Sequence, residues 1–496
     1  MILGVAIADF RQRSRGLGLT AWIAVALYAG VLLVPDRHAM YFVMDVGGST
    51  GVFNSAWVAG VCSFLLVSLF GLLGIFPVRI AIGRDALHAT DGIVASAPIS
   101  RIHFVAGKWL SNVWFLSCIS IALLVAAMVM QIVRHEVLII NIEAYVLDFV
   151  LIVLPAIVLV AAMAVLFETV ALLRGIFGSV LFVCLFYLAC IGLTRVEIGN
   201  LLYDPLGVGA ILTSITSQAQ STFHLTDAAQ SFIGATGKGP RLFVWQGLKW
   251  HAFGVLQRAF WLAIALFIVG LSAMLFDRFS RAWHVSKARV PAWRLRLWGT
   301  PLGVELPLLF CQLPRAWFLF AAGAAIFSAV SPIEIVARFG FPLCILFVLP
   351  AWASLGVAEF RNRTSELVAS INGLNAGFCF SKWMAGSIFG WIVCSGFIVA
   401  LFAHGQVAPG IACIAVIAAL AAVAYLFGTL TRSPRAFEVA FIIVWFIGPM
   451  NGVAAFDFTI SILRFPLTSI AVAGGVAMLA VFAVFSVPVS ARSRPS

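Results

Sequence analysis

The side chains that most often bind metals or act as nucleophiles are dispersed along this 496-residue chain. None of the eight His residues stands in an HExxH or other paired-ligand pattern, and no two of the nine Cys residues have CxxC spacing. No GxSxG nucleophile motif occurs either. The sequence therefore predicts no catalytic constellation and no metal site, and we interpret the cysteines as small hydrophobic core residues.

A phosphate-binding loop is also absent from the sequence. The most similar stretch, Gly234-Ala-Thr-Gly237-Lys238-Gly239, lacks the first Gly and the final Ser or Thr of GxxxxGK[ST]. We predict a flexible loop there, and no nucleotide or other cofactor bound by this chain itself.

Acidic residues inside the apolar stretches would be candidates for a proton relay. Only Asp148 and Glu168 come close, and they bracket an uncharged stretch at 149–167. We interpret both as interfacial charges, so the sequence predicts no proton relay within the membrane.

The one pattern with a chemical signature is a polar segment that occurs twice. Residues 83–109 and 357–383 match at a constant offset of 274, with seven identities in about 25 ungapped positions. Shared apolar composition does not explain so many identities outside the apolar stretches. The identical pairs are Thr90/Thr364, Val94/Val368, Ala95/Ala369, Ser96/Ser370, Phe104/Phe378, Lys108/Lys382 and Trp109/Trp383.

The first repeated segment (83–109) is amphipathic, which suits a short helix that docks into a groove on a partner. Thr90 can cap a helix that begins at Asp91, and Pro98 ends or redirects that helix. Lys108 ties the segment to the next apolar stretch. The alternative is an ordinary solvated loop, and its recurrence in the second repeated segment (357–383) favours docking. Before Lys108, the charged residues of the first repeated segment are Arg84, Asp85, Asp91 and Arg101.

Composition identifies the elements that must position these segments. The chain is 63% hydrophobic and only 10% charged, whereas soluble domains are about 45–50% apolar and about 25% charged. A soluble enzyme is thereby excluded. Its net charge of +12 does not indicate a nucleic-acid partner, because basic residues gather in cytoplasmic loops of membrane proteins.

Stretches without Asp, Glu, Lys or Arg mark the predicted membrane spans, because a charge at the bilayer centre costs about 2.5–3.5 kcal/mol. The long stretch 383–431 divides at a turn signal, AHGQVAPG (403–410), so the prediction is twelve helices. The uncharged stretches are 16–35, 46–78, 109–133, 149–167, 175–194, 259–276, 316–333, 339–358, 383–431, 439–456 and 465–491.

Basic residues predict the orientation of these spans. With both termini in the cytoplasm, cytoplasmic segments hold 22 of the 31 Lys and Arg, as the positive-inside rule requires. Residues 1–15 have apolar residues before Arg11, Arg13 and Arg15, the reverse of a signal peptide. We expect an amphipathic helix at the membrane surface there.

The sequence thus predicts an all-α polytopic membrane protein built as two parallel six-helix repeats. Residues 1–276 form the first half, 277–315 a basic cytoplasmic connector, and 316–496 the second half. Both repeated segments follow the second span of their half, so the halves have the same orientation. Only the first half has a long outer insertion, 195–254, which is a candidate lid, gate or site for an outer-side partner.

The first repeated segment resembles the region after the second span of ABC-2 type transporter permeases. There an acidic residue precedes a helix, a T/A-P-x-S-R turn ends it, and a Gly-Lys pair enters the next span. Here the turn is Ala97-Pro98-Ile99-Ser100-Arg101, and the pair is Gly107-Lys108. The second segment departs from the pattern, with Asn at 372 and 375 and Ser at 381, but keeps Lys382.

The resemblance implies a non-catalytic permease subunit in the bacterial inner membrane, in contact with the lipid bilayer and driven by separate ATP-binding subunits at the cytoplasmic face. ATP would be bound by that partner, and export is the direction the family implies. Two alternatives stay open: a twelve-span ion-coupled secondary transporter and a membrane enzyme or assembly factor. The residues expected to couple to the ATPase are Arg84, Asp85, Asp91, Pro98, Ser100, Arg101, Lys108, Glu359, Arg361, Arg363, Glu366 and Lys382.

Overall fold

The computed structural model describes most of the chain and divides it into two compact units, Met1–Val285 and Ser286–Ser496. The boundary between them falls inside the stretch predicted as the connector. The residues that are not described are 16, 37–40, 80, 84, 86–95, 135, 136, 138, 171, 172, 175, 194–203, 225–229, 236–240, 278–300, 362, 363, 365–374, 451–455 and 487–496.

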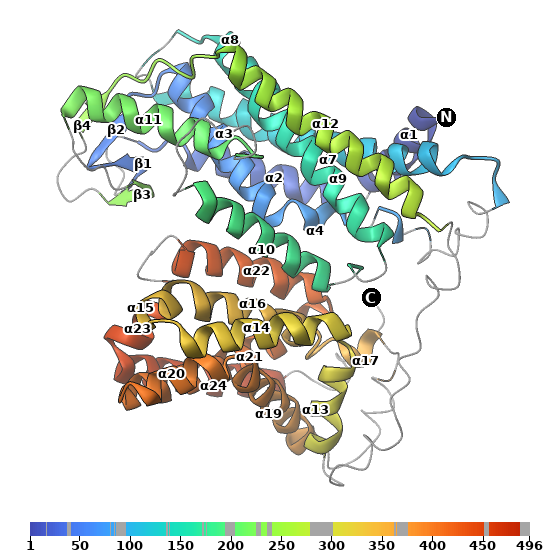
Figure 1. Cartoon of the computed structure of the whole chain (residues 1–496), viewed down its shortest axis with the longest axis vertical. Helices are drawn as coiled ribbons and strands as arrows, with labels where there is room; N and C mark the ends of the chain where they lie inside the picture. The colour runs from blue at the N-terminus through green and yellow to red at the C-terminus, as the bar shows by residue number, and fades with distance from the viewer. Residues whose placement is uncertain are drawn as a thin grey trace. The chain divides into compact units, whose positions relative to one another are not determined.

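The first unit is helical, with one small sheet (Figure 1). A π-helical turn, Phe149–Val153, joins two of its helices into one continuous rod. The helices are α1 (Ile2–Ser14), α2 (Leu17–Leu32), α3 (Ser55–Leu73), α4 (Ile75–Val78), α7 (Arg101–Arg134), α8 (Ile142–Asp148), α9 (Leu154–Thr169), α10 (Ile176–Leu193), α11 (Val208–Phe223) and α12 (Ala252–Leu275); the strands are β1 (Tyr41–Val46), β2 (Ser49–Gly51), β3 (Gln230–Ala235) and β4 (Arg241–Phe243).

All the regular secondary structure described in the second unit is helical. Its helices are α13 (Pro301–Cys311), α14 (Arg315–Val330), α15 (Ile333–Ile335), α16 (Phe341–Trp352), α17 (Ala358–Arg361), α19 (Asn375–Val393), α20 (Ser395–Ala403), α21 (Val407–Thr431), α22 (Pro434–Trp445), α23 (Phe458–Arg464) and α24 (Pro466–Ser486), with π-helical turns at Val336–Gly340 and Phe446–Met450.

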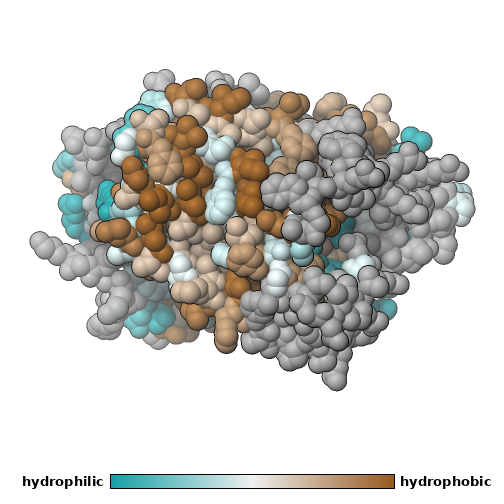
Figure 2. All heavy atoms as spheres, turned by 90° about the horizontal axis from the view of Figure 1, so that it is seen from below, coloured by the Kyte–Doolittle hydropathy of each residue, from teal (hydrophilic) through white to brown (hydrophobic). Residues whose placement is uncertain are grey.

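The helices have the length and composition of membrane spans. Among the described residues, six helices are long and apolar enough to cross a bilayer, or up to nine if each bent pair counts as one span. Figure 2 shows a face covered largely by apolar side chains, and α24 exposes Leu467, Met478 and Phe482. Exposure of so much apolar surface is typical of a lipid-facing protein. The chain is therefore a helical polytopic membrane protein.

The long helix α7 organises the first unit. Helices α1, α2, α3, α9 and α12 all pack against it, and α12 runs alongside both α7 and α9 (Figure 1). Helix α2 approaches α7 very closely at Gly30, where an added Cβ would lie 2.6 Å from the Leu123 carbonyl oxygen. Small residues permit such approach between membrane helices, where dispersion forces drive packing.

The sheet has the strand order β3-β1-β2-β4. It joins two segments that the orientation predicted from the basic residues places on the outer side. Strands β1 and β2 form a hairpin at Gly47-Gly48, which has φ values of 59° and 77°, as a two-residue turn with two left-handed residues requires. Strand β3 pairs with β1, with Val43 opposite Ile233. The flexible loop that was predicted at 234–239 is therefore wrong for its first two residues, Gly234 and Ala235, because strand pairing orders them; residues 236–239 lie outside the described residues.

Helix α19 and helix α20 of the second unit form one bent rod, with an angle of 63° at Cys394. The bend brings α20 against α14, where an added Cβ at Gly396 would lie 1.9 Å from the Ala325 carbonyl oxygen. Helices α21 and α24 pack through small side chains that include Ala422 and Ala473.

Every uncharged stretch that was predicted to span the membrane contains a helix in the structure. Helix α13 lies within the predicted connector, 277–315, and packs against α19 of the second unit. The span that was predicted at 149–167 begins earlier, because α8, the π-helical turn and α9 form one apolar rod from Ile142 to Thr169. Asp148 therefore lies within that rod.

Candidate functional site

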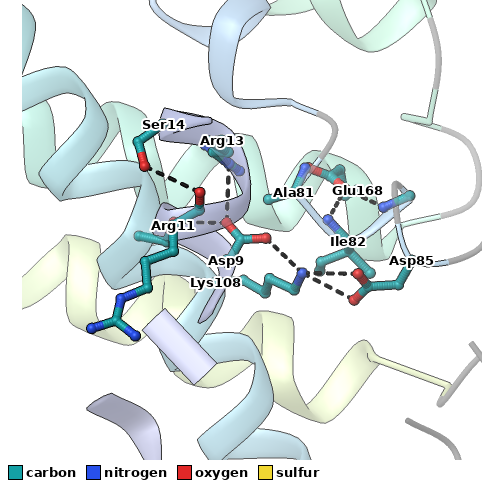
Figure 3. A network of polar contacts seen from close by, with 11 residues as sticks. Asp9, Arg11, Arg13, Ser14, Ala81, Ile82, Asp85, Lys108 and Glu168 are labelled. Atoms are coloured by element: carbon teal, nitrogen blue, oxygen red, sulfur yellow. Dashed lines mark hydrogen bonds and ion pairs between the residues drawn. The ribbon is translucent and has the colours of Figure 1, made fainter. Parts of the chain in front are cut away.

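Lys108, on the first turns of α7, is the centre of a buried ion-pair cluster (Figure 3). Its Nζ lies 2.7 Å from Asp9 Oδ1 of α1 and 2.9 Å from Asp85 Oδ2 of the first repeated segment. Lys108 is only 4% exposed, and so is Asp9. The cluster therefore ties three parts of the chain together: the N-terminal helix, the repeated segment and the third predicted span.

Further contacts hold Asp9 in place. Arg13 Nε lies 3.0 Å from Asp9 Oδ2, and Ser111 Oγ donates to the same oxygen at 2.7 Å. Burial alone would raise the pKa of Asp9, but the charges of Arg13 and Lys108 and the hydrogen bonds from Lys108 and Ser111 hold that pKa below its usual value. Asp9 is therefore held as a carboxylate.

Gly107 lets α1 lie directly on α7. An added Cβ at Gly107 would lie 2.6 Å from Val5 Cβ and 3.0 Å from the Ile2 carbonyl oxygen. The Gly-Lys pair thus has a steric and an electrostatic component: glycine admits the backbone of α1, and the lysine next to it binds the carboxylate that α1 carries.

Lys382 is the centre of an equivalent cluster in the second unit. Its Nζ lies 3.6 Å from Glu305 Oε2 of α13 and forms an ion pair with Glu359 of α17. Lys382 is 2% exposed. Burial and the neighbouring Glu359 raise the pKa of Glu305, against the opposing effect of Lys382. Among the described residues, one lysine here faces two carboxylates, and no second cation takes the part that Arg13 has in the first cluster.

The residues that flank the two lysines make equivalent contacts as well. Lys108 Nζ lies 5.5 Å from the centre of the Phe104 ring, and Lys382 Nζ lies 5.1 Å from that of Phe378. The next residue in each case is a tryptophan: Trp109 Nε1 donates to the Val158 carbonyl at 3.2 Å, and its counterpart, Trp383, donates to the Ala418 carbonyl at 2.8 Å. The three identities at offset 274 thus have the same roles in both units.

Glu168, at the end of α9, holds the start of the first repeated segment. Its carboxylate accepts backbone N–H bonds from Ala81, Ile82 and Gly83 at 2.8, 2.6 and 2.9 Å (Figure 3). Arg174 in turn donates to the Glu168 carbonyl at 2.7 Å. Three donors converge on one side chain that is 5% exposed. Glu168 lies at the end of α9, where the sequence placed it, but its role as a buried anchor was not predicted.

In the second unit, the chain at the start of the repeated segment is held without a carboxylate. Glu168 lies ten residues after Val158, and Gly428 lies ten residues after Ala418. Gly428 packs against the backbone of Gly356, where an added Cβ on Gly428 would lie 3.0 Å from Gly356 Cα. Close glycine packing thus replaces the hydrogen-bonded carboxylate.

Some of the predicted site residues lie at the surface instead. Pro98 and Arg101 are exposed, as is Arg361 at the end of α17. Ser100 is exposed at the start of α7. Its hydroxyl oxygen contacts His103 Nδ1 and also accepts a hydrogen bond from the His103 backbone N–H. We interpret Ser100 as a helix cap.

The remaining predicted site residues, Arg84, Asp91, Arg363 and Glu366, lie outside the described residues. The helix that was expected to begin at Asp91 lies there too.

Sequence reasoning missed Asp9 and Glu305, which complete the two clusters. The signal was a single acidic residue on a short apolar helix before a span. Both helices also contain Leu-Gly-Val, at Leu3–Val5 and Leu302–Val304, although the acidic residue comes one helical turn earlier in the second.

No group of three or more His, Cys, Asp or Glu that could hold a metal occurs among the described residues. Comparisons with protein-family models, curated proteins and solved structures found no match.

Proposed function

We propose that this chain is the membrane-spanning permease subunit of an ABC-2 type transporter of the bacterial inner membrane, an exporter driven by separate ATP-binding subunits. In this proposal the chain has twelve spans in two parallel six-helix halves, so that one chain forms a whole translocation domain. The proposal rests first on the resemblance of the first repeated segment to that family.

The observation that carries the proposal furthest is the recurrence of the Lys108 cluster around Lys382. Each cluster ties a repeated segment to the first turns of the following helix and to a preceding surface helix. A force applied to either segment is therefore transmitted to the helix bundle of its unit. Two such levers are what a pair of ATP-binding subunits needs to move two halves.

The two groups of predicted residues then have different roles. Buried Lys108 and Lys382, with half-buried Asp85 and Glu359, hold the segments rigid. Exposed Pro98, Arg101 and Arg361 are available for contact with the ATPase. Transport requires that the substrate bind the inward-open and outward-open states with different affinities.

The test is co-purification of the tagged chain with an ATPase in its native membranes, for which a neighbouring gene for an ATP-binding cassette protein supplies the candidate partner. We expect Arg101→Glu and Arg361→Glu each to reduce the ATPase that is bound and the ATP hydrolysis in the eluate. Arg464→Glu is the matched control, because Arg464 is exposed and predicted on the outer side. Equal recovery of the ATPase in all three variants would contradict the proposed docking surface.

The runner-up, an ion-coupled secondary transporter, predicts transport that continues without ATP and stops when the proton gradient is dissipated. One observation favours keeping it: the buried carboxyl of Asp148 lies within the apolar rod Ile142–Thr169. Purified protein that accumulates a solute in liposomes on an ion gradient alone would establish it in place of the permease.

A further inference from the structure

Asp148 is an acidic side chain inside the helix bundle of the first unit. It is 6% exposed and ends α8 immediately before the π-helical turn Phe149–Val153. It therefore lies within the apolar rod Ile142–Thr169 and not at its end, which overturns the interfacial placement expected from the sequence. Turns of π-helix within α-helices occur frequently at functional sites.

No hydrogen bond or ion pair reaches the Asp148 carboxyl from the residues that the structure describes. The ionisable group on which its charge acts is Cys62 of α3, which is completely buried. An ionised carboxylate without a partner is very costly to bury, and such a group takes up a proton instead. The described surroundings thus favour the neutral acid at Asp148.

The described cation on the helices that pack against this region, Arg258, forms its ion pair with another residue. Helix α3 contributes Cys62, and α12 contributes Arg258, whose guanidinium donates to the Asp204 carbonyl at 3.0 Å and lies 3.6 Å from the Asp204 carboxylate. On its own helix, Tyr145 lies one turn before Asp148. Glu168 is at the far end of α9 and is held by three backbone donors.

A column of polar groups leads from this region to the surface on the predicted outer side. Tyr145 donates to Gln131 Oε1 of α7 at 2.8 Å, and Gln131 Nε2 donates to Ser55 Oγ of α3 at 3.2 Å. Ser55 Oγ accepts from the Asn141 backbone and lies 3.4 Å from the carbonyl of Ile139, a residue that is 82% exposed. This column connects Tyr145, one turn before Asp148 on the same helix, with the exposed residue Ile139.

We propose that Asp148 is a proton-binding site that exchanges with the outer solution along the column Tyr145–Gln131–Ser55. On binding, hydronium transfers a proton to an Asp148 carboxylate oxygen and leaves water; on release, water takes the proton back. A metal cation fits less well, because no group of three His, Cys, Asp or Glu gathers there among the described residues. This inference is independent of the proposed permease function.

The test is infrared difference spectroscopy of the full chain in lipid nanodiscs, between about pH 5 and about pH 9, a range that covers buried carboxyls. We expect the C=O stretch of a protonated carboxyl to disappear at high pH and to shift in deuterium oxide. Asp148→Asn removes this band, and Asp148→Glu moves it, which identifies the group even if the Asn variant does not fold. Asp36→Asn, at an exposed aspartate, leaves it unchanged.

Gln131→Leu interrupts the column and tests the route. We expect slower hydrogen–deuterium exchange of the Asp148 carboxyl at an unchanged final spectrum. A band that never titrates or exchanges would show a permanently neutral structural carboxyl, and absence of the band would show an ionised one; either overturns the proposal. Loss of the band on addition of sodium or potassium at constant pH would overturn the assignment to a proton.

Discussion

Lys108 and Lys382 show how a single buried charge can organise a membrane protein. Each lysine is almost completely buried and contacts two carboxylates, one from its own repeated segment and one from a helix that is distant in the sequence. Burying ions costs free energy, so such a cluster adds little net stability, yet removing one partner leaves the others uncompensated. The cluster instead selects one arrangement of the preceding short helix, the repeated segment and the helix that carries the lysine.

Lys108→Met is therefore expected to destabilise the protein by about 3–5 kcal/mol, because Asp9 and Asp85 both lose an ion-pair partner in a buried site. Thermal unfolding in detergent measures this. Lys249→Met is the control, since Lys249 is exposed and such surface changes cost about 0.5 kcal/mol or less. The triple variant Asp9→Asn, Asp85→Asn, Lys108→Met should recover much of the loss; equal effects of K108M and K249M would contradict the role of the cluster.

The acids of the two clusters should respond to pH with opposite sign. The lowered pKa of Asp9 stabilises the fold above the ordinary value of 3.8, and this contribution is lost as the pH falls through the lowered pKa. The raised pKa of Glu305 stabilises the fold below its ordinary value of 4.5, and this contribution is lost as the pH rises through the raised pKa.

Unfolding midpoints between about pH 3 and about pH 8 for the parent chain, Asp9→Asn and Glu305→Gln measure these contributions. We expect Asp9→Asn to reduce the loss of stability at acid pH, and Glu305→Gln to become less harmful as the pH rises. Parallel pH profiles for all three proteins would contradict the assignment.

The sequence predicted the lysines but only half of their partners. Lys108 and Lys382 belong to the repeated pattern, and Asp85 and Glu359 lie near them in the chain. Asp9 is 99 residues from Lys108, and Glu305 is 77 residues from Lys382; no local pattern links them, because helix packing alone brings them together. Asp148 was misplaced because a charge-free stretch marks where charges are absent, not where a helix begins.

At the scale of elements, the first unit anchors its repeated segment by hydrogen bonds to Glu168, whereas the second does so by close packing of Gly356 and Gly428. A carboxylate that accepts three N–H bonds is a strong but polar anchor, since charge-assisted hydrogen bonds are stronger than neutral ones. The two segments therefore differ in how they can be released.

Glu168→Gln should loosen residues 81–83, because the amide has one acceptor oxygen and its NH₂ group faces N–H donors. A hydrogen bond to a charged group contributes about 1.5–3 kcal/mol, so faster amide hydrogen exchange is expected at Ala81, Ile82 and Gly83. Thr169→Val is the control, since that hydroxyl bonds within its own helix. Unchanged exchange in Glu168→Gln would contradict the anchor.

The strand pairing can be tested through its register. Opposed residues of antiparallel strands have Cα atoms about 4.5–5.5 Å apart, within the range of about 4.4–6.8 Å that a disulfide spans. Val43→Cys with Ile233→Cys should therefore form a disulfide on mild oxidation, detected as a linked peptide by mass spectrometry. Val43→Cys with Ser231→Cys, two residues out of register, should do so poorly; the reverse preference would contradict the sheet.

The sheet itself was not predicted, although Gly47-Gly48 is a recognisable hairpin signal. Its other half comes from residues about 190 further along the chain, and pairing over that distance leaves no local signature. The apolar helices, in contrast, were predictable because the bilayer imposes a length and a composition on each.

At the scale of the whole molecule, the proposed topology places Arg361 in the cytoplasm and His404 outside, on either side of the bent rod α19–α20. Both positions are exposed. A membrane-impermeant maleimide should therefore label His404→Cys in intact cells, but Arg361→Cys only after the membrane is opened. The eight native cysteines that are described are buried or half-buried, and the parent chain measures the background.

Labelling of both positions from the same side would show that α19 and α20 form a re-entrant loop, and would contradict the twelve-span topology. The result would leave the two lysine clusters untouched, because they depend on contacts within each unit.

The pairing of β1 with β3 has a mechanical consequence for the first unit. Strand β1 lies between α2 and α3, and strand β3 lies between α11 and α12, so their backbone hydrogen bonds join the two connections. The ends of these helices cannot separate without breaking the β1–β3 hydrogen bonds. The described part of the second unit has no strand pairing of this kind. We therefore expect the linked helix ends of the first unit to move less relative to one another than the helix ends of the second unit.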